Sequence, residues 1–220
     1  MPIFAWVVLW IAVFSAALVA TEARRSEKGR WLTKPFASAG FIALALVLGA
    51  WVVWPTGYIL LAALGLCFLG DLALIPDQEG PAFQAGVGAF ALGHLGFVVA
   101  FLSRLHPPAT LALMPLAVGS LLALAFGAAV MRILWPGVPA PLRGPTVAYV
   151  FVISAMVGAA AGTAELPGGG FVLAGAIIFY LSDLTVSFDR FKARRLVYRA
   201  VGLPMYYLAQ VLLVYGLLGA

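Results

Sequence analysis

The chain has 220 residues, of which 64% are hydrophobic and 10% charged, and its formal net charge is +5. Long uncharged runs in such a composition exclude a soluble globular domain and are typical of a polytopic membrane protein. The basic excess indicates membrane topology and contact with anionic lipids. It does not predict nucleic-acid binding, because the chain has no folded polar scaffold that would display the charges.

Apolar runs, compared with the roughly 20 residues needed to cross a bilayer, predict an all-α bundle of eight transmembrane helices that forms one domain. The predicted helices are residues 3–21, 34–53, 56–75, 83–103, 109–131, 144–164, 170–187 and 200–219. We interpret the first as a retained helix, since its start, Met1-Pro2-Ile3-Phe4, lacks a basic leader. The second is expected to begin with Lys34 and Pro35, because proline suits the first turn of a helix.

The basic residues predict how this bundle crosses the membrane. Twelve of the thirteen Lys and Arg residues fall in or beside alternate loops, and Arg104 alone falls on the other side. The twelve are Arg24, Arg25, Lys28, Arg30, Lys34, Arg132, Arg143, Arg190, Lys192, Arg194, Arg195 and Arg199. By the positive-inside rule these loops are cytoplasmic, so we expect both termini on the non-cytoplasmic side.

Two similar segments each place one carboxylate inside an apolar span. They are Phe68-Leu69-Gly70-Asp71-Leu72 and Tyr180-Leu181-Ser182-Asp183-Leu184. Each acid is predicted near the cytoplasmic end of its helix, and the two copies lie four helices apart, on the third and the seventh, which indicates a weak parallel repeat of two four-helix halves. An acid in hydrocarbon is costly and usually marks a functional site, although it can also simply hydrogen-bond a neighbouring helix. Two such acids suit acid/base chemistry or, alternatively, a small proton-coupled transporter.

Further polar residues in the predicted spans are candidates for orienting these acids or lining a substrate cavity. Tyr180 shares a helix face with Asp183, as Tyr206 does with Gln210, because three or four residues separate each pair. His94 is the only histidine in a predicted span. For each of these residues, ordinary interhelical hydrogen bonding or core packing is the alternative. We expect neither a metal ion nor another cofactor, since His94 and the two aspartates would form a three-ligand site only if their helices converged.

Two cations at the cytoplasmic boundary are candidates for binding a substrate phosphate. Lys34 is the stronger candidate, and Arg190 is the second. The alternative for each is a long side chain that reaches the membrane surface and only sets topology.

Several blocks occur in a fixed order along the chain. They are Thr33-Lys34-Pro35; Gly70-Asp71; Phe83, Gly86, Phe90, His94 and Phe97; Val147-Ala148-Tyr149; Phe179-Tyr180-Leu181-Ser182-Asp183 with Arg190-Phe191; and Tyr206-Tyr207-Leu208-Ala209-Gln210. In this order and spacing the chain resembles the lysoplasmalogenase (YhhN-like) family of integral membrane enzymes over almost its whole length. It departs from that pattern at Gly96-Phe97, where the family would have a tyrosine after the histidine, and at Pro204-Met205, where a threonine commonly precedes the paired tyrosines. Both departures concern the polarity of the expected pocket.

The resemblance implies hydrolysis of the vinyl-ether bond of a lysophospholipid, a lysoplasmalogen. The products would be a fatty aldehyde and glycerophosphoethanolamine or glycerophosphocholine. An enol ether is cleaved by protonation at carbon followed by attack of water, which suits two carboxylates. The resemblance therefore implies Asp71 and Asp183 as the catalytic pair, with Tyr149 among the residues around the site. An intramembrane aspartyl protease fits the order of the two acidic motifs poorly.

The amino-acid composition indicates the kind of organism and therefore the membrane in which the protein is expected. Ten arginines against three lysines, and no asparagine, indicate a GC-rich coding sequence. We therefore expect a bacterial plasma membrane, with the endoplasmic reticulum as the eukaryotic alternative. Small-residue faces such as Gly86-Val87-Gly88 permit close helix packing and leave both a monomer and an oligomer open.

Overall fold

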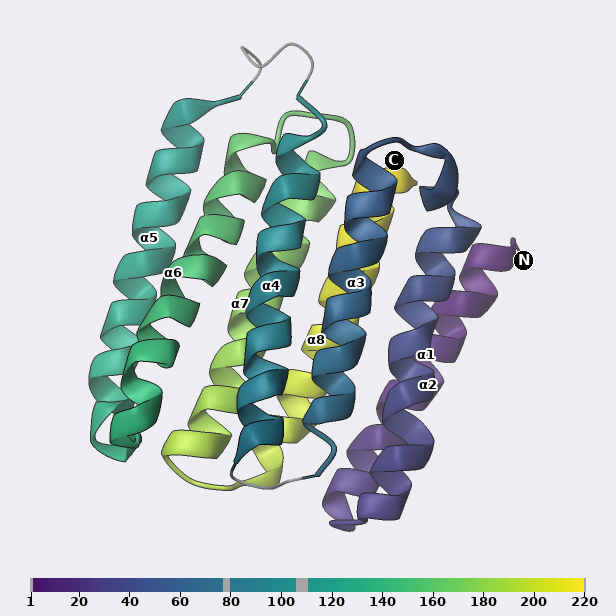
Figure 1. Cartoon of the computed structure of the whole chain (residues 1–220). Helices are drawn as coiled ribbons and strands as arrows, with labels where there is room; N and C mark the ends of the chain where they lie inside the picture. Colours follow the sequence, from purple (N-terminus) through teal and green to yellow (C-terminus); the bar gives the residue numbers. More distant parts are fainter. Residues whose placement is uncertain (1, 77–79, 106–110, 220) are drawn as a thin grey trace.

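A computed structural model describes residues 2–76, 80–105 and 111–219, and these residues form a bundle of eight α-helices without a β-strand (Figure 1). The helices are α1 (Ile3–Ala23), α2 (Glu27–Val47), α3 (Thr56–Ala73), α4 (Pro81–Leu102), α5 (Leu113–Leu134), α6 (Ala140–Gly162), α7 (Gly169–Phe191) and α8 (Leu196–Leu218). Two short 3₁₀ turns, η1 (Ala50–Val52) and η3 (Trp135–Gly137), follow α2 and α5. All helices except α2 are long and apolar enough to cross a membrane, so the chain is an integral membrane protein.

The prediction for the second helix was wrong at both ends. Helix α2 begins at Glu27, where the Ser26 hydroxyl caps it by accepting a hydrogen bond from the Gly29 amide at 3.0 Å. Pro35 therefore lies inside the helix and not in its first turn. At the other end, Gly49 adopts a left-handed conformation with φ of 84°. Helix α2 therefore ends at Val47, and residues 48–53, which were predicted to belong to it, lie beyond its end. Hydropathy failed here because a serine cap, and not an apolar run, sets the first turn.

The other seven helices each overlap the range predicted for them, although α6 and α8 begin earlier than expected, at Ala140 and Leu196. Consecutive helices run in opposite directions, and α1 begins and α8 ends at the same end of the bundle (Figure 1). At the opposite end, α1, α3, α5 and α7 finish. We call this opposite end the basic end, because all of the Lys and Arg residues except Arg104 lie near it.

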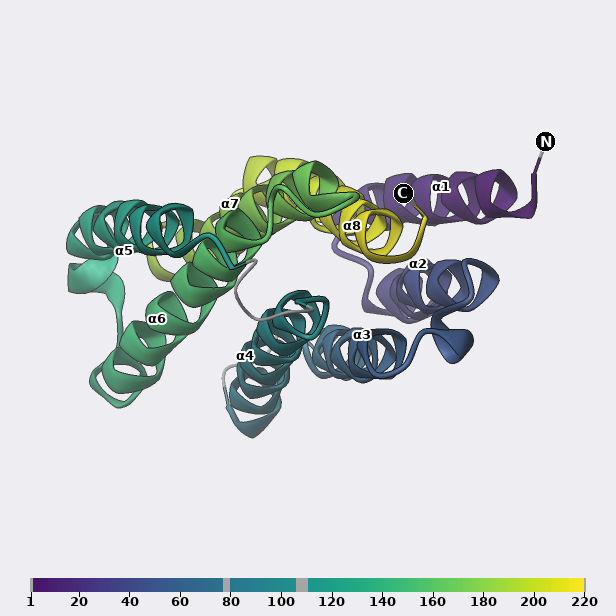
Figure 2. The ribbon, with the colours of Figure 1, turned by 90° about the horizontal axis from the view of Figure 1, so that it is seen from above.

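Seen from above, neighbouring helices in the chain pack as pairs, and α7 and α8 lie between the other pairs (Figure 2). Helix α8 packs against α1, α2 and α3 as well as α7, while α6 packs against both α4 and α7. Helices α3 and α7 carry the two similar acidic segments and run in the same direction, as expected (Figure 1). The relation between two four-helix halves stays a prediction.

Close helix contacts depend on glycine at a few crossings. At Gly216 on α8, a Cβ atom would lie 2.8 Å from the Gly168 carbonyl oxygen and 2.9 Å from the Val172 amide nitrogen. At Gly158 on α6, a Cβ atom would overlap the Ser120 hydroxyl of α5. These glycines let neighbouring helices approach closely, which is the packing that membrane helices use in place of large apolar cores.

Candidate functional site

A cavity of about 660 Å³ lies inside the bundle and extends to the basic end. Helices α2 to α8 all contribute to its wall, and Glu22 of α1 lines it at the basic end. Most of the wall is apolar, and its polar groups include both Asp71 and Asp183. The cavity has the size of a site for a small organic molecule or one lipid headgroup with part of its chain.

Asp71 on α3 is 2% exposed and is surrounded by donors from two other helices. Its Oδ2 accepts hydrogen bonds from the Ser38 hydroxyl of α2 and the Tyr206 hydroxyl of α8, each at 2.7 Å. Its Oδ1 lies 3.2 Å from the Lys34 ammonium, which is also buried. The Asp71 carboxylate thus has two hydroxyl donors and one ammonium group as its partners.

The donors around Asp71 are themselves ordered. Lys34 and Ser38 are four residues apart on α2, so both point to the same side of that helix. The Tyr207 and Ser38 hydroxyls lie 3.1 Å apart. Because Ser38 donates its proton to Asp71, Tyr207 must donate to Ser38. This chain of donors fixes the orientation of the Asp71 carboxylate.

Asp183 on α7 has a different environment. Its Oδ2 accepts a hydrogen bond from the Tyr149 hydroxyl of α6 at 2.7 Å and lies 3.4 Å from Nε2 of His94 on α4. His94 is fully buried, and its ring packs against Phe179 and Tyr149 with centroid distances of 4.5 Å and 5.5 Å. The Asp183 side chain remains 18% exposed, so the cavity can reach it.

The hydrogen bonds of His94 determine where a proton must lie. Nδ1 is 2.6 Å from the Phe90 carbonyl oxygen, which can only accept, so Nδ1 carries a proton. In a neutral ring Nε2 is then an acceptor facing the Asp183 carboxylate, which is also an acceptor when ionised. Two acceptors repel each other. A proton held between His94 and Asp183 would relieve this repulsion.

The Phe179 ring contacts both carboxylate clusters. It lies 5.2 Å from the Tyr206 ring, which belongs to the Asp71 cluster, and 4.5 Å from the His94 ring, which belongs to the Asp183 cluster. The fold thus brings Lys34, Asp71 and Tyr206 together in one cluster, and His94, Tyr149 and Asp183 in a second. Asp71 and Asp183 both line the same cavity.

Three predicted site residues lie outside these clusters. The Tyr180 hydroxyl lines the cavity but donates to the Ala123 carbonyl of α5 at 2.9 Å, and not to Asp183. Gln210 is fully buried, with its amide against the Cys67 thiol, and does not line the cavity. The Arg190 guanidinium lies at the basic end of the cavity, 4.1 Å above the centre of the Phe83 ring.

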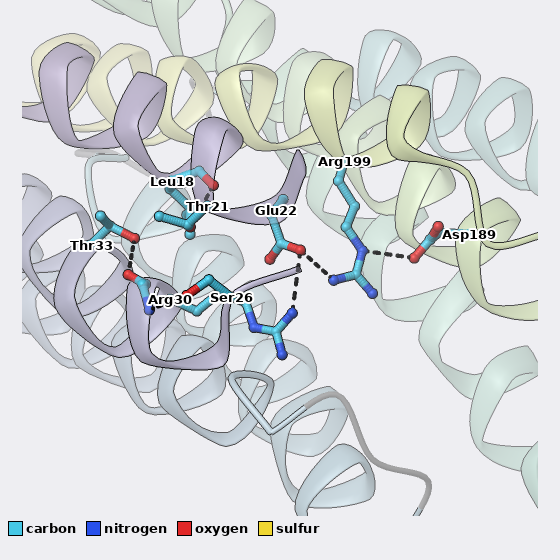
Figure 3. A network of polar contacts seen from close by, with 9 residues as sticks. Leu18, Thr21, Glu22, Ser26, Arg30, Thr33, Asp189 and Arg199 are labelled. Atoms are coloured by element: carbon cyan, nitrogen blue, oxygen red, sulfur yellow. Dashed lines mark hydrogen bonds and ion pairs between the residues drawn. The ribbon is translucent and has the colours of Figure 1, made fainter. Parts of the chain in front are cut away.

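A network of ion pairs joins four helices at the basic end of the cavity (Figure 3). Glu22 of α1 lies 3.5 Å from an Arg30 nitrogen of α2 and 2.6 Å from an Arg199 nitrogen of α8. A second Arg199 nitrogen lies 3.0 Å from Asp189 of α7, whose other oxygen accepts from the Arg195 amide. Each acid thus has a basic partner.

Sequence reasoning missed Ser38, Tyr207 and this network. The signal that could have found Ser38 is its four-residue spacing to Lys34, which puts both residues on one face of the predicted second helix. Tyr207 adjoins the predicted Tyr206, but nothing in the sequence shows which helix it faces. Among the residues that the structure describes, no three His, Cys, Asp or Glu side chains cluster closely enough to hold a metal ion.

The sequence was compared with protein-family models, with curated proteins and with solved structures. The sequence model of the YhhN family matches residues 29–217. The chain is 30% identical to mouse lysoplasmalogenase TMEM86B over 175 residues, 78% of this chain and 70% of that protein. It is 33% identical to human lysoplasmalogenase TMEM86B over 166 residues, 74% of this chain and 66% of that protein. No solved structure matches the chain. The protein therefore belongs to the YhhN family.

Proposed function

We propose that this protein hydrolyses the vinyl-ether bond of lysoplasmalogens, releasing a fatty aldehyde and a glycerophospho-base. The observation that supports this most strongly is the pair of aspartates on one apolar cavity with unlike proton environments. The names of the mouse and human relatives describe the same activity. An apolar cavity inside a membrane protein also suits a substrate with one long hydrocarbon chain.

The two environments suggest a division of labour. Asp183 and His94 hold one proton between them and act as the general acid that protonates the β-carbon of the vinyl ether. A C–H bond forms there, and the positive charge moves to the α-carbon and the ether oxygen as an oxocarbenium ion. Tyr149 orients Asp183 through its hydrogen bond.

Asp71 acts as the charge-stabilising group and the general base. Its ionised form, held by Lys34, Ser38 and Tyr206, stabilises the oxocarbenium ion and accepts a proton from the attacking water. The resulting hemiacetal then collapses: its bond to the glycerol oxygen breaks, that oxygen takes the proton held by Asp71, and the hemiacetal hydroxyl returns its proton to the Asp183–His94 pair as the aldehyde forms. One water is consumed for each aldehyde released, so atoms and charge balance.

The distribution of basic residues supports an orientation in the membrane. We place the basic end of the bundle, and with it the cavity entrance, on the cytoplasmic side. Both termini would then be non-cytoplasmic. We propose a bacterial plasma membrane as the location, because arginine outnumbers lysine and asparagine is absent.

The decisive experiment uses purified protein in detergent with two matched lipids. One is a 1-alkenyl lysophospholipid, and the other is its saturated 1-alkyl ether. We expect aldehyde from the alkenyl lipid only, since a saturated ether cannot be protonated at carbon. Transport requires two compartments, so turnover in detergent also separates hydrolysis from transport. Absence of aldehyde release by folded protein would refute the proposal.

A further inference from the structure

The cavity wall is exposed along one side of the bundle. Most of the residues that both line the cavity and are exposed lie on the first three turns of α4 and α6. They are Gln84 and Gly88 of α4, and Pro141, Pro145 and Ala148 of α6. No other described helix covers the side of the bundle between α4 and α6 (Figures 1 and 2). The cavity therefore opens sideways between these two helices, and we call this gap the α4–α6 opening.

The α4–α6 opening faces the bilayer and has small residues at its edges. Both helices are long and apolar enough to cross a membrane. Gln84 and Gly88 are four residues apart on α4, as Pro141 and Pro145 are on α6, so each pair lies on one face of its helix. A Cβ atom added at Gly88 would have no other atom within 4 Å. The opening thus offers space at the edge of the cavity to a group that comes from the lipid.

The α4–α6 opening ends at the level of the Asp183 cluster. The His94 ring of α4 lies 5.5 Å from the Tyr149 ring of α6, so the two helices are in contact at this depth. Ala148 precedes Tyr149, whose hydroxyl donates to Asp183. A group that lies between the two helices would therefore reach the Asp183 carboxylate directly from the bilayer.

Little of the cavity lies deeper than this level. The deepest residue of α6 that lines the cavity is Ile153, which follows Tyr149 by about one turn, or about 6 Å. Farther from the basic end, Phe97, Met156 and Phe179 are fully buried and do not line the cavity. The interior of the bundle is closed there by packed side chains.

The hydrocarbon chain of a lysoplasmalogen is longer than this space. A chain of roughly 16 carbons extends for about 20 Å, because its zigzag bonds are each about 1.5 Å long. With the vinyl ether at Asp183 and the headgroup toward the basic end, only the first few carbons fit deeper in the cavity. The rest of the chain needs a way out, and the α4–α6 opening leads into hydrocarbon at the same depth. A chain that stays in lipid also avoids contact with water.

We propose that the alkenyl chain of the substrate passes through the α4–α6 opening and remains in the bilayer, so that the cavity encloses only the headgroup, the vinyl ether and the first few carbons. This rests on the proposed function for the identity of the substrate. The enzyme then takes its substrate sideways from the membrane. It recognises the bond to be cleaved and its neighbours, and it does not measure chain length.

The test closes the α4–α6 opening with Gly88→Trp and Ala148→Trp together. Two 1-alkenyl lysophospholipids, with alkenyl chains of 16 and of four carbons, are compared in phosphatidylcholine nanodiscs. We expect kcat/KM for the long chain to fall by about 10- to 100-fold, because the indole rings occupy its path. The four-carbon chain fits inside the closed cavity, so its kcat/KM should stay within about threefold of wild type. Equal losses on both substrates, or a loss on neither, would overturn the proposal.

Gly144→Trp is the matched control. Gly144 is also exposed on α6, and a Cβ atom added there has no other atom within 4 Å, but the residue does not line the cavity. We expect kcat/KM for both substrates within about threefold of wild type. A loss on the long chain as large as in the double variant would overturn the proposal, because any bulky lipid-facing side chain would then have the same effect.

Wild-type protein provides a second test through chain length. We expect kcat/KM for chains of 14, 16 and 18 carbons, at equal mole fraction in the nanodiscs, to agree within about threefold, because these chains differ only in the part that stays in lipid. A preference of about tenfold or more for one length would overturn the proposal, since it would require an enclosed chain.

Binding of the saturated 16-carbon 1-alkyl lysophospholipid needs no catalysis, so it separates this proposal from the proposed function. We expect its Kd, measured as a mole fraction in the nanodiscs, to rise at least about tenfold in the double variant and to stay unchanged in Gly144→Trp. Unchanged binding in the double variant would overturn the proposed path even if aldehyde is formed. Weakened binding without aldehyde from the wild type would support the path and refute only the activity.

Discussion

At the scale of single residues, two aspartates with almost identical sequence neighbours acquire opposite chemical environments. Asp71 is surrounded by three donors, one of them charged. Asp183 accepts from one hydroxyl donor and lies 3.4 Å from Nε2 of the buried His94. The cost of a charge in hydrocarbon identified both residues from sequence. Their partners were harder to predict, because Ser38, Tyr149 and His94 come from other helices whose facing sides only the packed bundle defines.

His94→Gln tests the shared proton. Glutamine keeps a polar group of similar size but cannot hold a second proton at the position of Nε2. We expect kcat to fall by about 10- to 100-fold, with KM within about threefold, because the substrate does not need His94 to bind. Wild-type activity should fall as pH rises, once the pair loses its proton, and this fall should shift in the variant. A pH–rate profile identical to wild type would show that His94 is only a packing residue.

Lys34→Met separates the two roles considered for Lys34. Methionine retains the apolar stem and removes the ammonium group that lies 3.2 Å from Asp71 Oδ1. We expect a fall in kcat of at least about tenfold with little change in KM, and partial recovery in Lys34→Arg. Steady-state kinetics with matched size-exclusion profiles provides the measurement. A higher KM with unchanged kcat would instead indicate that Lys34 binds the substrate phosphate.

At the scale of helices, hydropathy predicted that α2 exists but not the residue at which it begins. The apolar runs predicted eight transmembrane helices; the described residues form eight helices, of which seven are long and apolar enough to cross a membrane. Helix α2 begins in a polar segment, where Ser26 and Glu27 suit a helix start but do not contribute to hydropathy. The earlier start moves Lys34 from the expected first turn into the interior of the helix. Hydropathy does not show which face of α2 meets Asp71, and for this reason Ser38 was not predicted.

Gly216→Ala tests the close contact between α8 and the start of α7. The added Cβ would meet backbone atoms of Gly168 and Val172, which cannot rotate away as a side chain would. We expect a loss of stability of about 1–3 kcal/mol, seen as a lower Tm in detergent. Gly65→Ala on α3 is the control, because no atom lies within 4 Å of the added Cβ. It should be neutral or slightly stabilising, since alanine favours helix. Equal Tm values for the two variants would argue against this contact.

At the scale of the whole molecule, the topology and the cavity share the basic end of the bundle. The alternating directions of consecutive helices follow from their lengths and the short connections, and the sequence predicted this alternation. The cavity could not be predicted from the sequence, because side chains from α2 to α8 line it and only the packed bundle brings them together.

Cysteine labelling tests the orientation. In a Cys67→Ala background, Lys28→Cys and Glu165→Cys place one exposed thiol at each end of the bundle. We expect a membrane-impermeant maleimide to label Glu165→Cys in intact cells and Lys28→Cys only after permeabilisation, as the positive-inside rule requires. The reverse pattern would place the cavity entrance on the outer side.

The central claim is that Asp71 and Asp183 together hydrolyse a vinyl ether. Its most direct test is aldehyde release from a 1-alkenyl lysophospholipid by purified wild-type protein, Asp71→Asn and Asp183→Asn, each confirmed to be folded. We predict about one aldehyde per lipid consumed by the wild type and a loss of 10²-fold or more in kcat for each variant. Wild-type turnover by either folded variant would contradict the claim.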